Sequence, residues 1–529
     1  MKMNVPPFPA DYRASGLLLH VTSLPSPYGI GDLGPTAVAW IDRLHDAGQR
    51  WWQLLPLGPA GAGDSPYQPL SSFAGNPLLI SPTWLIEDGL VRASDCGAGA
   101  LSATAVDFEA VREFKSGLIE TAWWNFRAGR RSDLRARFEQ FGLDHAHWLN
   151  DYALFRALHA KYAGKSYLQW PEPLVRRMPA ALAAARRSLA SEVERVRFEQ
   201  FLWFRQAERL HAHARATGVR LLGDLPFFVS AESSDVWSHP ELFLLGPQHR
   251  PRVVAGVPPD YFSARGQLWG NPIYDWDELR EQGYRWWIDK TRALLVSVDA
   301  IRLDHFRGFA AAWHVPATAP TAEEGRWVPG PGASLFGAVR KALGALPFVA
   351  EDLGIITPDV ITLRDAFDLP GTRVLQFGFD DDPDNAHLPG NHVHNGVVYT
   401  GTHDNPTTRG WYEDLPAPRR RALWTVADRP QGTASDAAPA LMDLAWSSVA
   451  ALAIAPLQDV LNLGRPARMN QPGTAYGNWR WRAPADLLSA PALESLRALT
   501  QASCRSAAAE RMPARRARSG QPAADVRST

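Results

Sequence analysis

A chain of 529 residues with 55 Lys and Arg and 55 Asp and Glu carries no net charge, which excludes an overall field that would attract nucleic acid or an anionic membrane. Hydrophobic residues make up 46% and charged residues 21%, the balance of a globular protein, which excludes a largely disordered chain. The only cysteines, Cys96 and Cys504, exclude a disulfide scaffold and show no metal-ligand spacing, so we expect a reducing, cytoplasmic location.

The first residues, MKMNVPPFPADYRASG, contain no apolar stretch of signal-peptide length, so we expect no export signal. Short apolar runs rich in β-forming residues then recur along the chain, and most are separated by stretches of helical periodicity. They lie at 16–21, 50–55, 219–224, 298–304, 347–351, 372–377, 396–400 and 454–460. This alternation predicts an α/β fold, a (β/α)₈ TIM barrel.

The interval between the second and third runs is far longer than one crossover helix requires, which predicts a mostly helical subdomain at about 56–218. Its clearest helical patterns lie at 108–126 and 191–218, and the second pattern stops at Gly218. The longest apolar run, 440–457, is interrupted by polar residues, so we interpret it as a buried helix that runs into a strand.

The predicted barrel spans 14–502 and contains further insertions. A segment at about 229–287 is rich in Gly, Pro and aromatic residues, which predicts loops over a site. Smaller insertions are predicted at about 305–346 and 378–395, an N-terminal extension at 1–13, and a disordered tail rich in Arg and Ala at 503–529.

Three of the apolar runs are followed by an acidic residue. These are Asp304 in RLDHFRG, Glu351 in VAEDLG and Asp404 in TGTHDN. Active sites of such barrels lie at the carboxyl ends of the strands, so we expect the three carboxylates to converge. Like charges at close range raise one another's pKa, a cost that a structural core avoids. Glycoside cleavage uses this arrangement, because one carboxylate attacks the sugar while another donates a proton.

Each carboxylate also has a structural interpretation. Asp304 could form an ion pair with Arg302 or Arg307, Glu351 could cap the next helix, and Asp404 could support the turn before Pro406. Arg302 lies two residues before Asp304 and therefore on the same face of the strand, where its charge would keep that carboxylate ionised. His403 beside Asp404 suits hydrogen bonds to the hydroxyls of one sugar ring.

These segments resemble the amylomaltases, the 4-α-glucanotransferases of glycoside hydrolase family 77. The resemblance continues through SGLLLHVTSLPSPYGIGDLG, SPYQPLSSFAGNPLLIS, GVPPDYFSARGQLWGNPIYDW and GRPARMNQPGTAYGNWRWR, from about residue 14 to about 485. It implies a barrel with inserted subdomains and no C-terminal β-sandwich, acting on α-1,4-glucans with another glucan or glucose as acceptor. No nucleic acid or membrane partner is expected.

The resemblance implies roles for single residues. Asp304 is similar to the nucleophile, Glu351 to the acid/base and Asp404 to the residue that holds the donor sugar. Residues similar to those that bind substrate are Tyr67, Asp224, Arg302 and His403 at the donor sugar, Ser65, Gln267 and Trp269 along the cleft, and Tyr261 and Phe262 on the acceptor side. We place the RMNQPGT loop on the acceptor side with Tyr261 and Phe262. No metal or organic cofactor is expected, because the acid, base and nucleophile are side chains.

The sequence departs from the family pattern at Thr372 and Pro406, where Met and Asp are expected. Two alternative functions remain open. A retaining α-glucan hydrolase, similar to an α-glucosidase or amylase, shares the covalent intermediate and differs only in what attacks it. A catalytically inactive protein that binds glucans through its aromatic residues is the alternative from another class.

Overall fold

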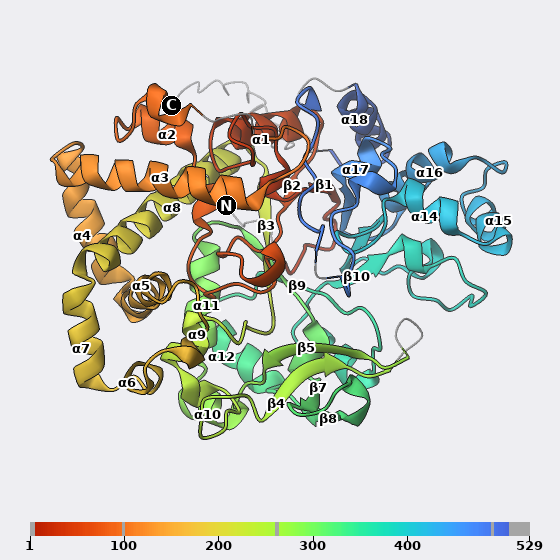
Figure 1. The fold of residues 1–529 in the computed structure, drawn as a ribbon. Coiled ribbons are helices and arrows are strands. Elements are labelled where there is room, and N and C mark those ends of the chain that lie inside the picture. Colours follow the sequence, from red (N-terminus) through yellow and green to blue (C-terminus); the bar gives the residue numbers. More distant parts are fainter. Residues whose placement is uncertain (1–5, 98–100, 260–263, 475, 488–490, 507–529) are drawn as a thin grey trace, which may run out of the picture.

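The computed structural model describes residues 6–97, 101–259, 264–474, 476–487 and 491–506. Its centre is a closed barrel of parallel strands in the order β1-β12-β11-β10-β9-β6-β3-β2 (Figure 1). The strands are β1 (Ala14–Leu18), β2 (Trp51–Gln53), β3 (Arg220–Leu225), β6 (Ala300–Leu303), β9 (Phe348–Ala350), β10 (Gly371–Val374), β11 (Gly396–Tyr399) and β12 (Leu452–Pro456). Each overlaps one of the predicted apolar runs, so the barrel prediction is confirmed.

Helices surround the barrel because its strands are apolar on both faces and must be covered (Figure 1). They are α1 (Pro35–Asp46), α8 (Ala190–Thr217), α11 (Arg285–Leu295), α12 (Ala333–Leu343), α13 (Pro358–Ala366), α14 (Thr408–Asp414), α15 (Ala417–Val426), α16 (Ala434–Ser447), α17 (Leu457–Val460) and α18 (Ala492–Ala502). The run 440–457 forms the end of α16 and then β12, as predicted.

The segment between β2 and β3 is helical. It contains α2 (Pro82–Glu87), α3 (Phe108–Arg127), α4 (Arg135–Asp144), α5 (Ala146–Lys161), α6 (Glu172–Val175), α7 (Pro179–Ser188) and α8. The α8 helix ends where expected, because Gly218 adopts φ 85°, a left-handed conformation that glycine tolerates at a helix end.

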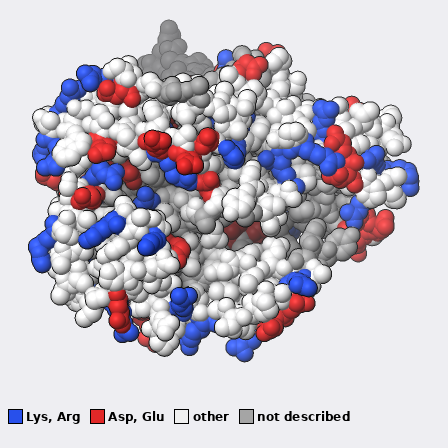
Figure 2. Space-filling view, in the orientation of Figure 1, with Lys and Arg blue, Asp and Glu red and all other residues white. Residues whose placement is uncertain are grey.

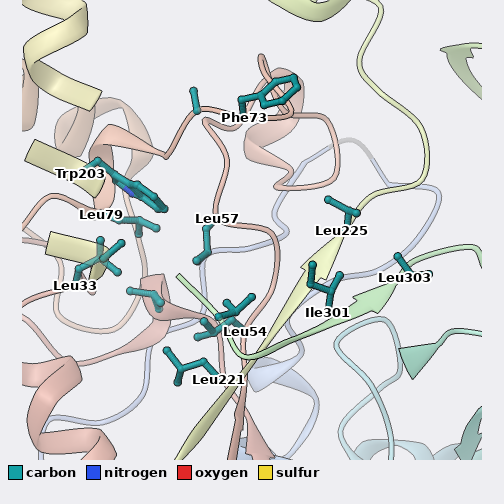
Figure 3. Close-up of a cluster of buried hydrophobic side chains, with 14 of the residues drawn as sticks. Leu33, Leu54, Leu57, Phe73, Leu79, Trp203, Leu221, Leu225, Ile301 and Leu303 are labelled. Atoms are coloured by element: carbon teal, nitrogen blue, oxygen red, sulfur yellow. The ribbon is translucent and has the colours of Figure 1, made fainter. Parts of the chain in front are cut away.

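Helix α8 joins this segment to the barrel through a continuous apolar core. Trp203 of α8 lies near Leu79 and Leu57, with Leu221 of β3 in the same cluster (Figure 3). Gly75 lies against the indole, where an added Cβ would be 1.9 Å from a Trp203 ring atom. Gln200 of α8 also bonds both the amide and the carbonyl of Gly75. Only glycine permits this approach between the loop and α8.

A second sheet is formed by segments that precede and follow β6 in the chain. It is antiparallel in the order β5-β4-β7-β8, with β4 (Val253–Val257), β5 (Gln267–Pro272), β7 (Ala311–Pro316) and β8 (Arg326–Pro329). Figure 1 shows the four strands together, below the barrel in that view. The short helix α9 (Ser234–Ser238) and α10 (Trp276–Glu281) flank β4 and β5 in sequence. The segment 229–287 therefore contains regular structure where the sequence predicted loops.

The chain remains folded past the predicted start of the tail at residue 503. Arg505 is fully buried and donates hydrogen bonds to backbone carbonyls of Ala14, Ala445, Trp446, Ser448 and Ala450. The boundary at 503 was therefore wrong for residues 503–506, and the rest of that prediction, 507–529, lies outside the described residues.

Within the described ranges, no helix is long and apolar enough to cross a bilayer.

Candidate active site

Asp304 and Glu351 lie next to each other at the carboxyl ends of two neighbouring strands. Asp304 follows β6 directly and Glu351 follows β9, and the two strands pair in parallel. A Glu351 carboxylate oxygen accepts a hydrogen bond of 2.7 Å from the amide of His305, the residue after Asp304. The amide of Phe306 donates to the Glu351 carbonyl at 3.1 Å. The backbone therefore fixes the two acidic residues against each other.

Arg302 connects the acidic groups. Its Nη1 lies 2.8 and 2.9 Å from the two carboxylate oxygens of Asp224 and 3.1 Å from Asp304 Oδ1. Its Nη2 lies 4.0 Å from Glu351 Oε2. Arg302 points to the same side of β6 as Asp304, as the period of a strand predicts. A single buried guanidinium thus contacts three carboxyl groups.

Asp404 reaches the same site from the loop after β11. Its Oδ1 accepts a hydrogen bond of 2.6 Å from Asn470 Nδ2 and lies 3.4 Å from His403 Nε2. The turn itself is made by Asn405, whose side chain accepts from the amide and hydroxyl of Thr402 at 2.9 and 2.8 Å. The Asp404 side chain is therefore not needed for the turn before Pro406.

The other structural interpretations also fail in this geometry. Arg307 donates to the Ile355 carbonyl and its guanidinium lies 3.7 Å from the centre of the Trp327 ring, so it is not the partner of Asp304. Helix α13 has Thr357 as its N-cap, and Glu351 bonds to His305 instead. The ion pair of Asp304 with Arg302 is present, and it is also the contact that the functional interpretation requires.

The environment gives the two central carboxyl groups different protonation states. Burial in the cleft raises the pKa of Glu351 to about 8, with Asp304 adding to the rise and Arg302 opposing it. Burial also raises the pKa of Asp304 to about 6, against the opposing charge of Arg302, and Asp224 and Asp404 add to the rise. At pH 7 Asp304 is mostly ionised and Glu351 is mostly protonated.

Tyr67, His403 and Trp479 form an aromatic wall beside these carboxylates. The Tyr67 hydroxyl donates to Asp224 Oδ2 at 2.7 Å, and its ring stacks on His403 with centroids 5.2 Å apart. Trp479 lies 5.8 Å from Tyr67 and 5.9 Å from His403. Burial raises the pKa of Tyr67 and lowers that of His403, so both rings are neutral at pH 7.

Three of the remaining predicted residues contact residues of the site or one another. Trp269 of β5 meets His305 edge to face at 5.0 Å and donates to Gln267 at 3.1 Å. Ser65 is half-buried, and its hydroxyl accepts from the Tyr67 amide at 3.3 Å. Tyr261 and Phe262 lie outside the described residues.

Sequence reasoning missed several residues that touch the site. Arg468 donates to the Asp404 carbonyl at 2.6 Å, and the Asn470 amide donates to the His403 carbonyl at 3.1 Å. Their loop therefore packs against Asp404 and His403, and its predicted place on the acceptor side stays a prediction. His20 is buried near His403, and burial lowers its pKa to about 3. It follows β1, so the strand-end rule that found Asp304 could have found it.

The two departures from the family pattern are accommodated without disturbing the carboxylates. Thr372 donates to the Ala350 carbonyl at 3.0 Å, and the Pro406 carbonyl accepts from Gln376 at 3.1 Å. Thr372 thus satisfies its hydroxyl inside the barrel.

The surface of the molecule is hollowed, and a cavity lies beside His403. Figure 2 shows a hollow across the middle of one face, with acidic side chains at its floor. The cavity is partly open to solvent and is lined by His20, Thr402, His403, Asn405 and Arg468 among others, and Asp304, Glu351 and Asp404 are not among its described lining residues. Among the described residues, no group of three or more His, Cys, Asp or Glu is arranged to hold a metal ion.

Comparisons with known proteins agree with this geometry. The family described as 4-alpha-glucanotransferase, glycoside hydrolase family 77, matches residues 19–488. The 4-alpha-glucanotransferase of Thermus thermophilus is 48% identical over 499 residues, 93% of this chain and 98% of that protein. That of Synechocystis sp. is 47% identical over 485 residues, 90% of this chain and 95% of the relative.

Two solved structures are also similar to this chain. The amylomaltase from Streptococcus agalactiae in complex with acarbose superposes with a TM-score of 0.89 at 34% identity, covering 93% of this chain and 100% of that one. The amylomaltase from Corynebacterium glutamicum, at 20% identity and a TM-score of 0.77 over 94% of this chain and 76% of its own, shares the fold. The chain belongs to the 4-alpha-glucanotransferases of glycoside hydrolase family 77.

Proposed function

We propose that the protein transfers segments of α-1,4-glucans from a donor to the 4-hydroxyl of an acceptor glucan or glucose, by a retaining double displacement. The observation that carries the proposal is the pair Asp304 and Glu351, which follow neighbouring strands and share Arg302. Burial raises the pKa of Glu351 above that of Asp304, which suits one group to act as acid and the other as nucleophile. Family membership and the acarbose complex of a relative support the substrate class.

In the first displacement the ionised Asp304 attacks the anomeric carbon of the donor. The bond from that carbon to the glycosidic oxygen breaks, and Glu351 transfers its proton to the departing oxygen. The products are a β-linked glycosyl ester on Asp304 and a shortened glucan with a free 4-hydroxyl. Arg302 lies 3.1 Å from Asp304 and stabilises its ionised form before attack.

In the second displacement Glu351, now ionised, removes the proton from the 4-hydroxyl of the acceptor. The acceptor oxygen attacks the same anomeric carbon, the ester bond breaks, and Asp304 regains its negative charge. Two inversions restore the α configuration. The acid, the base and the nucleophile are all side chains of this chain.

The residues around the pair have proposed binding roles. Asp404 and His403 receive hydroxyls of the donor sugar and favour its distorted form, while Asp224, Arg302 and Tyr67 hold one another and line the same subsite. Ser65, Gln267 and Trp269 contact the glucan along the cleft. Tyr261 and Phe262 are proposed for the acceptor side on the resemblance alone.

Pure maltotriose tests transfer against hydrolysis. A transferase forms glucose and longer oligomers with almost no net increase in reducing ends, because every cleaved bond is replaced. A hydrolase raises the reducing ends steadily, and a glucan-binding protein without activity leaves maltotriose unchanged. Chromatography of the products with a parallel reducing-end assay therefore separates the proposed function from both alternatives.

We also propose that the enzyme works in the cytoplasm on maltodextrins or glycogen fragments. Both cysteines are free in the structure, which is compatible with a reducing compartment. The proposed organisation is one barrel domain, 14–502, with the insertions at 56–218, 229–287, 305–346 and 378–395 shaping the cleft.

A further inference from the structure

His403 and Asp404 are carried by one loop, residues 400–408, called here the 400–408 loop, which joins β11 to α14. Thr400 follows β11 directly, and Thr408 is the first residue of α14. Both threonines are fully buried, whereas 47% of the Asp404 side chain is exposed. The loop therefore has buried ends and presents Asp404 from its middle.

One carboxylate, that of Asp459, holds both ends of this loop. Its Oδ2 accepts a hydrogen bond of 2.6 Å from the Thr400 hydroxyl and one of 2.7 Å from the Thr408 hydroxyl. Its Oδ1 accepts from the Thr408 amide at 2.8 Å. Asp459 lies in α17, which follows β12, the strand that pairs with β11. A neighbouring part of the barrel thus fastens the end of β11 to the start of α14.

Gln376 adds a third neighbouring segment to this arrangement. It follows β10, and its Nε2 donates to the Thr408 hydroxyl at 3.2 Å and to the Pro406 carbonyl at 3.1 Å. The Thr408 hydroxyl therefore accepts from Gln376 and donates to Asp459, so its proton has one direction. Segments that follow β10, β11 and β12 meet at the carboxyl end of the barrel, where the 400–408 loop begins and ends.

Asp459 is buried without a countercharge in the described part of the chain. Burial raises its pKa, and the hydrogen bonds from Thr400 and Thr408 oppose that rise. A buried carboxyl group is costly in free energy unless its hydrogen bonds are well made. The three bonds offset that cost here, and they also fix the geometry of the groups that make them.

All three of these partners donate to Asp459, and a carboxylate has the two acceptor oxygens that they need. In either orientation of asparagine at this position, an NH₂ group replaces one oxygen. The donors that met that oxygen then lose their acceptor inside the barrel, which costs more than an unmade bond at the surface. The substitution Asp459→Asn therefore loosens the ends of the loop while it keeps the size of the side chain.

We propose that Asp459 is a positioning residue for transfer, which fixes the ends of the 400–408 loop so that His403 and Asp404 meet the donor sugar in the required geometry. This inference rests on the proposed function. Asn405 shapes the turn within the loop through its bonds to Thr402, whereas Asp459 ties the loop to the segment that follows β12.

Steady-state kinetics of Asp459→Asn on maltotriose test the inference. We expect kcat to fall about tenfold and KM to stay within about twofold, because a displaced Asp404 is felt mainly in the transition state. The matched control is Asp88→Asn, which changes another buried carboxyl group, held by Arg131 and Arg205 in the helical segment between β2 and β3. Both variants should melt at a lower temperature than the wild type, but only Asp459→Asn should lose kcat where both are folded.

Thr400 gives a second test that leaves the buried carboxylate in place. Thr400→Val removes the hydroxyl that donates to Asp459 and keeps the branched shape, so we expect kcat to fall about threefold. Thr400→Ser keeps the donor and should keep kcat. A role in packing alone would give the opposite order, because serine lacks the methyl group that valine retains.

Two results overturn the inference. One is a kcat for Asp459→Asn that stays within about twofold of the wild type, and the other is an equal loss of kcat in Thr400→Ser and Thr400→Val. If Asp459→Asn does not fold, the two Thr400 variants decide alone. Failure of the proposed function looks different, because the wild-type protein itself would then form no longer oligomers from maltotriose.

Discussion

At the scale of single residues, burial and the position of Arg302 together decide which carboxyl group keeps a proton. Its guanidinium is closest to Asp224, at 2.8 and 2.9 Å, then to Asp304 at 3.1 Å, and Glu351 is farthest at 4.0 Å. The stabilisation of a negative charge falls with distance, so Glu351 receives the least of it. Glu351 is also less exposed than Asp304, with 12% against 28% of the side chain accessible. Both effects leave the proton on Glu351.

This arrangement predicts a bell-shaped pH dependence of kcat/KM. The nucleophile must be ionised, so activity falls as the pH drops through about 6, the pKa of Asp304. The acid must be protonated, so activity falls as the pH rises through about 8, the pKa of Glu351. Because the two groups interact, the limbs report the pair. Rates of maltotriose disproportionation across the pH range measure both limbs.

An alkaline limb that stays unchanged in Glu351→Gln would contradict this assignment. Glutamine has no ionisable proton, so the residual activity of this variant should no longer fall as the pH rises through about 8. A single limb near the ordinary pKa of an exposed carboxyl group would equally show that the cleft does not shift these residues.

At the scale of elements, local patterns predicted the barrel strands and the acids that follow them. The apolar run at 298–304 ends in Asp304, and in the structure the buried strand β6 is likewise followed directly by Asp304. Strands of a barrel are buried and active sites lie at their carboxyl ends, so the local sequence carries both signals. Helix α8 was predicted to its last residue, since its apolar spacing and Gly218 are both local signals.

Contacts between distant segments could not be predicted in this way. Strands β4 and β7 pair although they come from different insertions, so neither segment alone indicates the second sheet. Arg468 and Asn470 reach Asp404 from a loop that follows β12 and α17, and no strand-end rule identifies them. Asp404 was found from the sequence, but the residues that hold it were not.

The contact of Arg468 with Asp404 gives a prediction for this loop. Replacing Arg468 with Met removes the bonds to the Asp404 and Asn470 carbonyls and lets the Asp404 backbone shift, so we expect kcat to fall about 10- to 100-fold. The value of KM should change less, because the misplaced group acts mainly in the transition state. Steady-state kinetics on maltotriose separate the two parameters.

Arg468→Lys and Arg419→Met are the controls for this prediction. Lysine restores a donor to the Asp404 carbonyl and should recover part of kcat, whereas Arg419 is an exposed residue of α15 whose loss should have no effect. Equal kinetics for Arg468→Met and Arg419→Met would show that the loop does not position Asp404.

At the scale of the whole molecule, the barrel is closed between its first and last strands, and two arginines secure that closure. Strand β1 pairs with β12. Arg505 donates to the carbonyls of Ala14, the first residue of β1, and Trp446 of α16. Arg13 donates to the Ser503, Ser448 and Trp446 carbonyls. The C-terminal residues that the composition assigned to a disordered tail therefore stabilise the seam.

Two truncations test this role. Ending the chain after residue 502 removes Arg505 and leaves buried carbonyls without donors, so we expect a loss of about 2–5 kcal/mol and a lower melting temperature. Ending it after residue 506 keeps all these bonds and should leave the melting temperature unchanged. Calorimetry of the two truncated proteins gives the comparison, and equal melting temperatures would show that Arg505 does not hold the seam.

The account as a whole depends on Asp304 forming a covalent bond to the donor, and trapping that intermediate tests it most directly. In Glu351→Gln, α-maltotriosyl fluoride can still glycosylate Asp304, because fluoride leaves without a proton, but no base then activates an acceptor. Peptide mass spectrometry should find the maltotriosyl group on Asp304, and none when Asp304→Asn is added. A label on Asp404, Asp224 or any other residue would contradict the mechanism.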